Sequence, residues 1–302
     1  MMTWFILSLI TVFFWSGSDF FSKLGSPAED KYSHWKMVMA VGIVMGIHAS
    51  YMVIFGGVKV ELRDFIVYLP ASFCYILSMI IGYAGLRYIE LSISSPICNS
   101  SGAVAAILCA VFLGQTMFLY QVAAVVLITI GIVFLQGVDV QLDKERKESD
   151  PKYVRSAKAI MFPLLYCLID GLGTFADAVL LDGYIEEGSA NVAYEFTFLA
   201  MAFFAAIYIT KVKKEKLWNG AVSFRKLEAP KFLAATSETI GQFAYIYAIS
   251  ANAILAAPLI SAYCVLSMVW SRIFLKEKLT RKQYLAIGIA VIGIILLGIG
   301  DA

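Results

Sequence analysis

The chain has 302 residues, of which 60% are hydrophobic and only 15% are charged, and its net charge is +2. A soluble domain carries about 25% charged residues, so this composition excludes an ordinary soluble enzyme. The high hydrophobicity also excludes a disordered chain. The small net charge does not favour a nucleic-acid partner. We therefore expect an integral membrane protein whose main surroundings are the lipid bilayer.

Ten segments are apolar and long enough, or nearly so, to cross a bilayer, which takes about 20 residues in a helix. In chain order they are 4–22, 35–55, 65–86, 91–113, 118–136, 158–182, 190–210, 231–250, 252–275 and 283–299. Short joins predict tight hairpins between the third and fourth segments and between the eighth and ninth. The first segment lacks a preceding basic residue and a small-residue cleavage site, so it is predicted to be a retained helix.

Lysine and arginine are distributed unevenly between these segments. The loops that follow the first, third, fifth, seventh and ninth segments carry 22 of the 24 basic residues, with their flanking ends included. The other loops carry only Lys59 and Arg63. Basic residues remain on the cytoplasmic side during insertion. The pattern predicts a cell (plasma or inner) membrane protein with both termini on the extracytoplasmic side.

The sequence contains an internal repeat. A shift of 162 residues aligns 83–135 with 245–297 without a gap, with ten identities in 53 positions. Pro96 then meets Pro258. Each half has five helices, and an odd number places the two halves in opposite orientations, as in many secondary transporters.

The predicted fold is therefore an all-α integral membrane protein with ten transmembrane helices arranged as two inverted five-helix repeats. Its predicted parts are a first repeat over 1–136, a charged cytoplasmic linker over 137–157 and a second repeat over 158–302.

Three short runs carry a resemblance to a known family: Phe14-Trp15-Ser16-Gly17, Leu113-Gly114-Gln115 and Leu275-Lys276-Glu277-Lys278-Leu279. With them the chain resembles the EamA-like group of the drug/metabolite transporter (DMT) superfamily. That family tends to carry Gly-Glu where the fourth helix of each half ends, and here each half keeps one of the two residues. The resemblance implies a transporter whose fifth helix in each half is peripheral. It also implies cytoplasmic termini, the reverse of what the charges predict.

Polar residues at membrane depth predict a pathway. Asp170 and Thr174 share a helix face with Tyr166 and Asp177, and Asp170 lies mid-segment, where a carboxylate costs about 2.5–3.5 kcal/mol. Asp177 and Asp19 lie nearer helix ends, where a carboxylate can reach lipid headgroups.

The segments 91–113 and 252–275 each contain a proline, which removes a backbone hydrogen bond. Broken helices at the midplane point to a substrate site, and this favours Asn99 and its repeat counterpart Ser261. The alternative is a kink that local serines satisfy, with nothing bound.

The predicted substrate-binding residues are Trp15, Ser16, Asp19, Tyr75, Tyr83, Asn99, Asp170, Thr174, Glu238, Gln242, Tyr245 and Ser261. Burial disfavours a charged carboxylate, so the candidates for carrying a coupling proton are Asp170, Glu238, His48 and Glu195. Each has a structural alternative: a carboxylate hydrogen bonded to a neighbouring helix, a core histidine, or an aromatic ring used for packing.

We expect a secondary-active transporter of a small polar metabolite (cationic, zwitterionic or neutral; an amino acid, an amine or a sugar-like solute). It would work by alternating access and could be coupled to protons. The alternative is a flippase or exporter of lipid-linked or nucleotide-sugar cargo. No catalytic motif supports an enzyme, and the five cysteines form no C-x-x-C pair, so neither a cofactor nor a metal is expected. The oligomeric state stays open.

Overall fold

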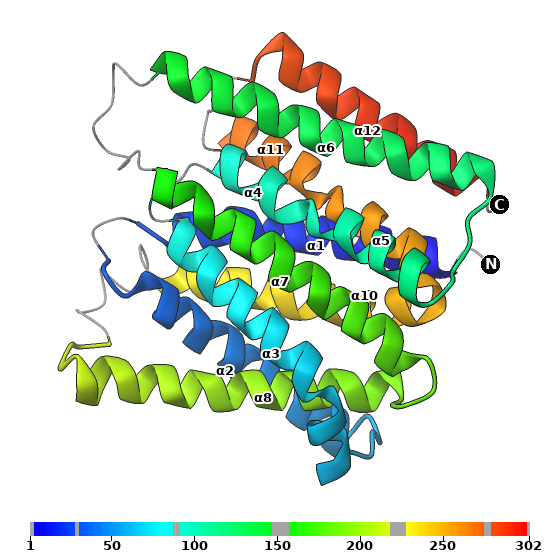
Figure 1. Cartoon of the computed structure of the whole chain (residues 1–302). Coiled ribbons are helices and arrows are strands. Elements are labelled where there is room, and N and C mark those ends of the chain that lie inside the picture. The colour runs from blue at the N-terminus through cyan, green and yellow to red at the C-terminus, as the bar shows by residue number, and fades with distance from the viewer. Residues whose placement is uncertain are drawn as a thin grey trace.

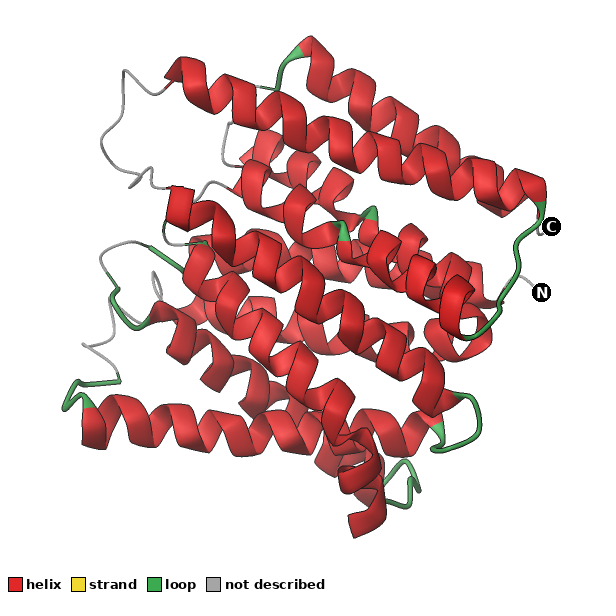
Figure 2. Ribbon diagram, viewed as in Figure 1, coloured by secondary structure: helices red, strands yellow, loops and turns green. Residues whose placement is uncertain are grey.

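The computed structural model describes residues 3–27, 30–86, 88, 91–146, 157–217, 228–274 and 279–300. These residues form helices joined by short loops and contain no strand (Figure 2). The helices are α1 (Thr3–Leu24), α2 (Ser33–Ile54), α3 (Leu62–Gly85), α4 (Leu91–Asn99), α5 (Ser101–Phe112), α6 (Leu119–Arg146), α7 (Ala157–Leu181), α8 (Glu187–Ile207), the π-helical turn η1 (Tyr208–Val212), α10 (Ala229–Ser261), α11 (Tyr263–Phe274) and α12 (Arg281–Gly300).

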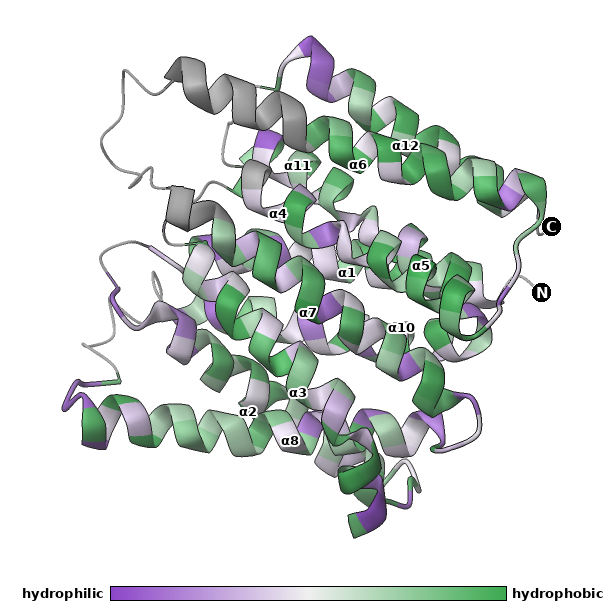
Figure 3. Ribbon diagram, in the orientation of Figure 1, coloured by the Kyte–Doolittle hydropathy of each residue, from purple (hydrophilic) through white to green (hydrophobic). Residues whose placement is uncertain are grey.

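Most of these helices have the length and composition of membrane spans. Within the described residues, eight helical stretches are long and apolar enough to cross a bilayer, and Leu119–Leu135 is a shorter apolar helix. One of the eight, Ala229–Phe274, is 46 residues long, about twice what one crossing requires. Its backbone becomes extended at Asn252, where the sequence predicts a tight hairpin. Figure 3 shows hydrophobic residues over most of the helical surface and hydrophilic ones towards the helix ends.

Two helices break at corresponding places. The first break, at Ser100, separates α4 from α5, and the second, at Ala262, separates α10 from α11. Each break lies four residues after a proline, Pro96 or Pro258, which itself lies inside a helix and withholds one backbone donor there. The interruption that the two prolines predict is therefore present in both.

The helices pack as a bundle of close pairs (Figure 1). The main pairs are α1 with α10, α2 with α8, α3 with α7, and α6 with α12. The last pair lies at one edge of the bundle, where the resemblance places the fifth helix of each half. Gly131 and Gly293 lie at its contact, since an added Cβ would come within 2.8 Å of Ala290 and 2.7 Å of Ala124.

The two ends of the bundle differ in charge. At one end, here called the basic end, α1 finishes, α2 begins, η1 finishes and α10 begins. Lys36 and Lys231 pair there with Asp30 and Glu228 over 3.1 to 3.6 Å. At the opposite end, here called the terminal end, lie the start of α1 and the end of α12 (Figure 1).

The helix predicted over 118–136 is longer than expected. As α6 it continues to Arg146, so the first ten residues of the predicted linker 137–157 are helical. Polarity marks where an apolar segment leaves a membrane, but Gln, Leu, Lys, Glu and Arg are good helix formers in water too. The remainder of the linker over 147–156, like the repeat end 275–278, lies outside the described residues.

Candidate functional site

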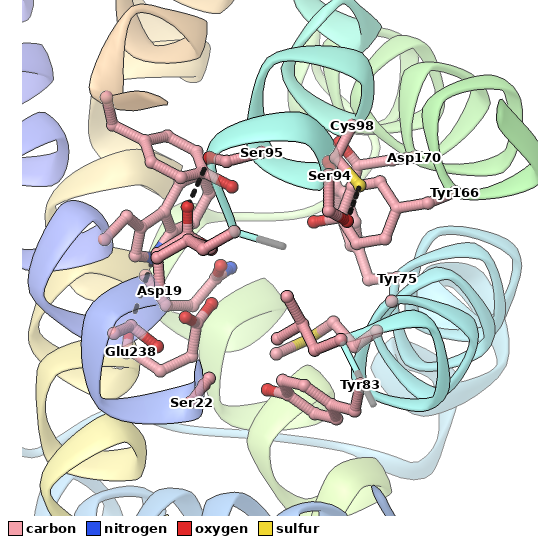
Figure 4. Close-up of a pocket in the computed structure, with 18 of the residues that line it drawn as sticks. Asp19, Ser22, Tyr75, Tyr83, Ser94, Ser95, Cys98, Tyr166, Asp170 and Glu238 are labelled. Carbon is pink, nitrogen blue, oxygen red and sulfur yellow. Dashed lines mark hydrogen bonds between the residues drawn. The ribbon is translucent and has the colours of Figure 1, made fainter. Parts of the chain in front are cut away.

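A polar cavity lies inside the bundle, between α1, α3, α4, α7, α8, α10 and α11 (Figure 4). Its volume is about 70 Å³, and it extends from mid-depth to the basic end, where Ser22, Leu86 and Leu91 line it. Its acidic and hydroxyl-bearing lining residues are Ser18, Asp19, Ser22, Ser94, Ser95, Asp170 and Glu238. Its aromatic lining residues are Trp15, Tyr75, Tyr83, Tyr166, Tyr194 and Tyr263.

Asp19 on α1 is held by hydroxyls from two other helices. Ser95 of α4 and Ser267 of α11 both donate to its Oδ2, the second over 3.0 Å. Ser95 directly precedes Pro96 in α4, and Ser267 lies beyond the break at Ala262, so both donors come from the interrupted helices. Asp19 was expected to reach towards headgroups, but it lines the cavity instead.

Asp170 on α7 lies at the start of α5. Ser101, the first residue of α5, donates to its Oδ2 over 2.8 Å, and Ser78 of α3 donates to its Oδ1 over 3.3 Å. A helix N-terminus carries partial positive charge that stabilises an anion. The break at Ser100 therefore creates a local stabilisation for a carboxylate at membrane depth.

Glu238 on α10 is the third carboxylate of the cavity. Its side chain is hydrogen bonded to Ser18 and interacts electrostatically with Asp19 and Asp170. Its backbone oxygen accepts a hydrogen bond from the Trp15 indole over 3.4 Å. Three acids from three helices thus surround one space.

Two further lining groups have no hydrogen-bond partner among the described residues. They are the Tyr83 hydroxyl and the Gln242 Nε2 amide. Buried polar groups are nearly always hydrogen bonded to protein or to solvent. A polar solute or water inside the cavity would satisfy both.

Towards the terminal end the cavity is closed by a cluster of tyrosines around Asp177, here called the tyrosine layer. Tyr68 and Tyr75 donate to the two Asp177 oxygens, the second over 2.6 Å, and the Tyr75 and Tyr245 hydroxyls are 2.6 Å apart. Trp15 stacks on Tyr245 with ring centroids 4.9 Å apart. Asp177 is fully buried, so the expectation that it reaches lipid headgroups is wrong.

Two further spaces lie near this layer. One is lined by Asn99, Thr174, Tyr245 and Ser261 together with Trp15 and Asp170. The other, at the terminal end, is lined by polar residues that include Gln115, Asp182, Ser250 and Asn252. The tyrosine layer lies between the main cavity and the terminal-end space.

All predicted substrate-binding residues except Ser16 line the main cavity or the neighbouring space. Ser16 faces a helix contact instead, where its Oγ donates to the Phe13 oxygen over 2.7 Å and accepts from Trp270 over 3.0 Å. The structure brings these residues together, although their role in binding stays a prediction.

His48 and Glu195 line neither space. They form a pair between α2 and α8, with His48 Nδ1 2.8 and 2.9 Å from the two carboxylate oxygens. The sequence analysis named both residues separately and did not connect them.

Tyr68 and Ser267 are among the residues that hold the carboxylates, and both were missed in the sequence analysis. Tyr68 and Tyr75 are seven residues apart, so they share a helix face. This spacing predicts that Tyr68 lies on the same side of its helix as Tyr75. Ser95 and Ser101 are among the local serines near Pro96 that were considered, but the sequence did not connect them with a carboxylate. Ser267 had no signal, because small hydroxyls are frequent in membrane helices and its acceptor is distant in sequence.

Comparison with known proteins identifies the family. The EamA-like transporter family matches residues 2–136 and 157–299, which is nearly the whole chain in two parts. The chain belongs to the EamA-like transporter family. It is thus a multi-pass membrane transporter of the DMT type, and this family comprises transporters rather than enzymes.

The fold has precedent among solved structures, of which 28 chains match. One is a crystal structure of a protein that shares 14% identity with this chain at a TM-score of 0.64. The match covers 98% of this chain and 96% of that one, so the overall fold of the EamA-like chain is shared. No curated protein sequence matches it.

Proposed function

We propose that this EamA-like protein is a secondary-active transporter of a small polar metabolite. The observation that carries the proposal is the cavity with three carboxylates, which extends towards the basic end and is closed towards the terminal end. A solute held there would be reached from the basic end while the terminal end is closed, which is one state of alternating access. The substrate would be cationic, zwitterionic or neutral, since three acids would repel the phosphates of lipid-linked or nucleotide-sugar cargo.

The pairing of the helices supports two inverted five-helix halves. In this arrangement α1 corresponds to α7, α2 to α8, α3 to the first part of α10, and α6 to α12. A two-fold axis that relates these helices exchanges the pair α1–α10 with the pair α7–α3. It also maps the pairs α2–α8 and α6–α12 onto themselves. All four pairs are among the main contacts. The breaks at Ser100 and Ala262 are separated by 162 residues, the offset of the sequence repeat.

We place the outer gate at the tyrosine layer. Opening the terminal end requires the hydrogen bonds between Asp177 and its tyrosines to break, which would join the cavity to the space lined by Gln115 and Asn252. Rocking of the two halves about the bound solute would do this.

Proton coupling would use the cavity carboxylates. Asp170 and Glu238 face the same space. Protonation of either would neutralise a negative charge that a bound cationic substrate would otherwise balance. His48 and Glu195 form a separate pair that could exchange a proton between α2 and α8. The partners are then the small-molecule substrate and the bilayer of the cell membrane, with both termini outside.

A binding screen followed by transport tests this proposal. Purified protein is screened by thermal shift against amines, amino acids, nucleobases and sugars at two pH values, and each hit is measured in proteoliposomes with and without a pH gradient. We expect a pH-dependent hit whose uptake follows the gradient. Asp170→Asn combined with Glu238→Gln should abolish the coupled flux, whereas Glu215→Gln, an exposed acid at the basic end, should leave it unchanged. Coupled flux that persists in the double variant contradicts the mechanism.

A further inference from the structure

We propose that the cavity binds organic diamines, with one ammonium group at Asp19 and Glu238 and the other at Asp170. The inference rests on the proposed transport function and narrows its substrate class to dications with an apolar spacer.

The first argument is the placement of the acids. Asp19 on α1 and Glu238 on α10 belong to two tightly packed helices and form one wall of the cavity. Asp170 projects from α7 on the opposite wall, and the open space lies between them (Figure 4). Two separated anionic centres match a ligand with two separated cationic ends.

The second argument is what lies between these centres. Tyr83, Tyr166 and Met79 also line the cavity, and Tyr75 lines it at the tyrosine layer. Aromatic faces attract ammonium groups, and they also suit the methylene groups of a short alkyl chain. The unpartnered Tyr83 hydroxyl can accept a hydrogen bond from an ammonium group.

The third argument concerns the carboxylate group of an amino acid. A broken helix could bind it at an exposed N-terminus, but the N-terminus of α5 is already occupied by Asp170 through Ser101. A Cβ at Gly102 would meet Ser261 at 2.0 Å and Ala257 at 2.4 Å, so α10 covers the first turn of α5 closely. A second carboxylate does not fit at this N-terminus, so the α5 break offers no site for the carboxylate of a zwitterion.

Matched ligands test the inference on the full-length protein in nanodiscs by calorimetry at neutral pH. Diaminobutane, butylamine and 4-aminobutanoate have similar length and differ in one terminal group. We expect diaminobutane to bind at least about tenfold more tightly than either, because the second ammonium binds as a tethered group. Across diaminopropane to diaminohexane the affinity should pass through a maximum, since both ends must reach their acids.

A variant tests whether Asp170 binds the second ammonium group of the diamine. Asp170→Asn should reduce the affinity for diaminobutane to within about threefold of that for butylamine, because only one anionic centre remains. Glu215→Gln is the matched control and should change neither.

Equal affinity for diaminobutane and butylamine, or tighter binding of 4-aminobutanoate, overturns the inference even if a variant fails to fold, because this comparison uses the wild-type protein. In that outcome the transporter proposal survives if another solute is transported. Absence of transport for every solute contradicts the transporter proposal instead.

Discussion

At the scale of single residues, the protein stabilises carboxylates inside a membrane with neutral donors from neighbouring helices. Asp19 and Asp170 each accept hydrogen bonds from two serines, and Asp177 accepts from two tyrosines. Hydrogen bonds to a charged acceptor contribute about 1.5–3 kcal/mol each. They lower the cost of burial without cancelling the negative charge that a cationic solute would meet.

The pair of His48 and Glu195 gives a prediction at this scale. The Glu195 side chain is fully buried, so His48→Ala leaves a buried acid without its partner. We expect a loss of about 3–5 kcal/mol, measured as a lower thermal unfolding temperature in detergent. Adding Glu195→Gln to His48→Ala should recover part of this loss, because the neutral amide is cheaper to bury. An unchanged unfolding temperature for His48→Ala would contradict the importance of the pair.

At the scale of elements, small residues and prolines determine how the helices meet. Gly42 and Gly46 on α2 are one helical turn apart and face Phe198 and Leu199 of α8, the small-xxx-small arrangement that lets membrane helices approach closely. Gly114 has φ +62 just beyond the end of α5, a backbone conformation that glycine adopts without strain and that often terminates a helix.

The contact of α2 with α8 is tested by adding one methyl group. A Cβ at Gly42 would lie 2.5 Å from the Phe198 backbone oxygen, whereas one at Gly288 on α12 meets nothing within 4 Å. Gly42→Ala should therefore destabilise the protein by about 1–3 kcal/mol through overpacking, and Gly288→Ala should not. Thermal unfolding of the two variants in the same detergent provides the comparison. Similar losses in both would contradict the packing argument, because alanine is a better helix former than glycine and helix propensity alone destabilises neither variant.

At the scale of the whole molecule, the lysines and the cavity are oriented towards the same end of the bundle. The described lysines at the end of η1 and at the start of α2 lie at the basic end, towards which the cavity also extends. If that end faces the cytoplasm, the closed tyrosine layer faces outward and the structure is open inward.

Labelling of introduced cysteines tests this orientation. Tyr184→Cys lies in the exposed connection between α7 and α8, and Lys216→Cys lies in the exposed segment after η1 at the basic end. A membrane-impermeant maleimide applied to intact cells should label Tyr184→Cys and not Lys216→Cys. The wild-type protein, whose described cysteines are mostly buried, gives the background. The reverse pattern would place the termini in the cytoplasm, as the family resemblance implies.

Much of the site could be predicted from the positions of polar residues in an apolar chain. Asp170, Thr174 and Asp177 share one face because a helix has a fixed period, and the prolines in the two repeats predict the broken helices. Ser16 was misassigned because position in a polar stripe does not determine which neighbour a side chain contacts. Asp177 was placed near headgroups because depth along a helix does not reveal what surrounds it.

The sequence by itself determined that the chain is a membrane protein of helices, which residues are polar at depth, and where the helices break. These properties depend on hydropathy, period and proline chemistry, all of which are local. Only the tertiary structure decided that Asp19, Asp170 and Glu238 surround one cavity, that Asp177 belongs to a closing layer, and that His48 meets Glu195. Those contacts join residues far apart in sequence, and they form because the bundle packs particular helix faces against one another.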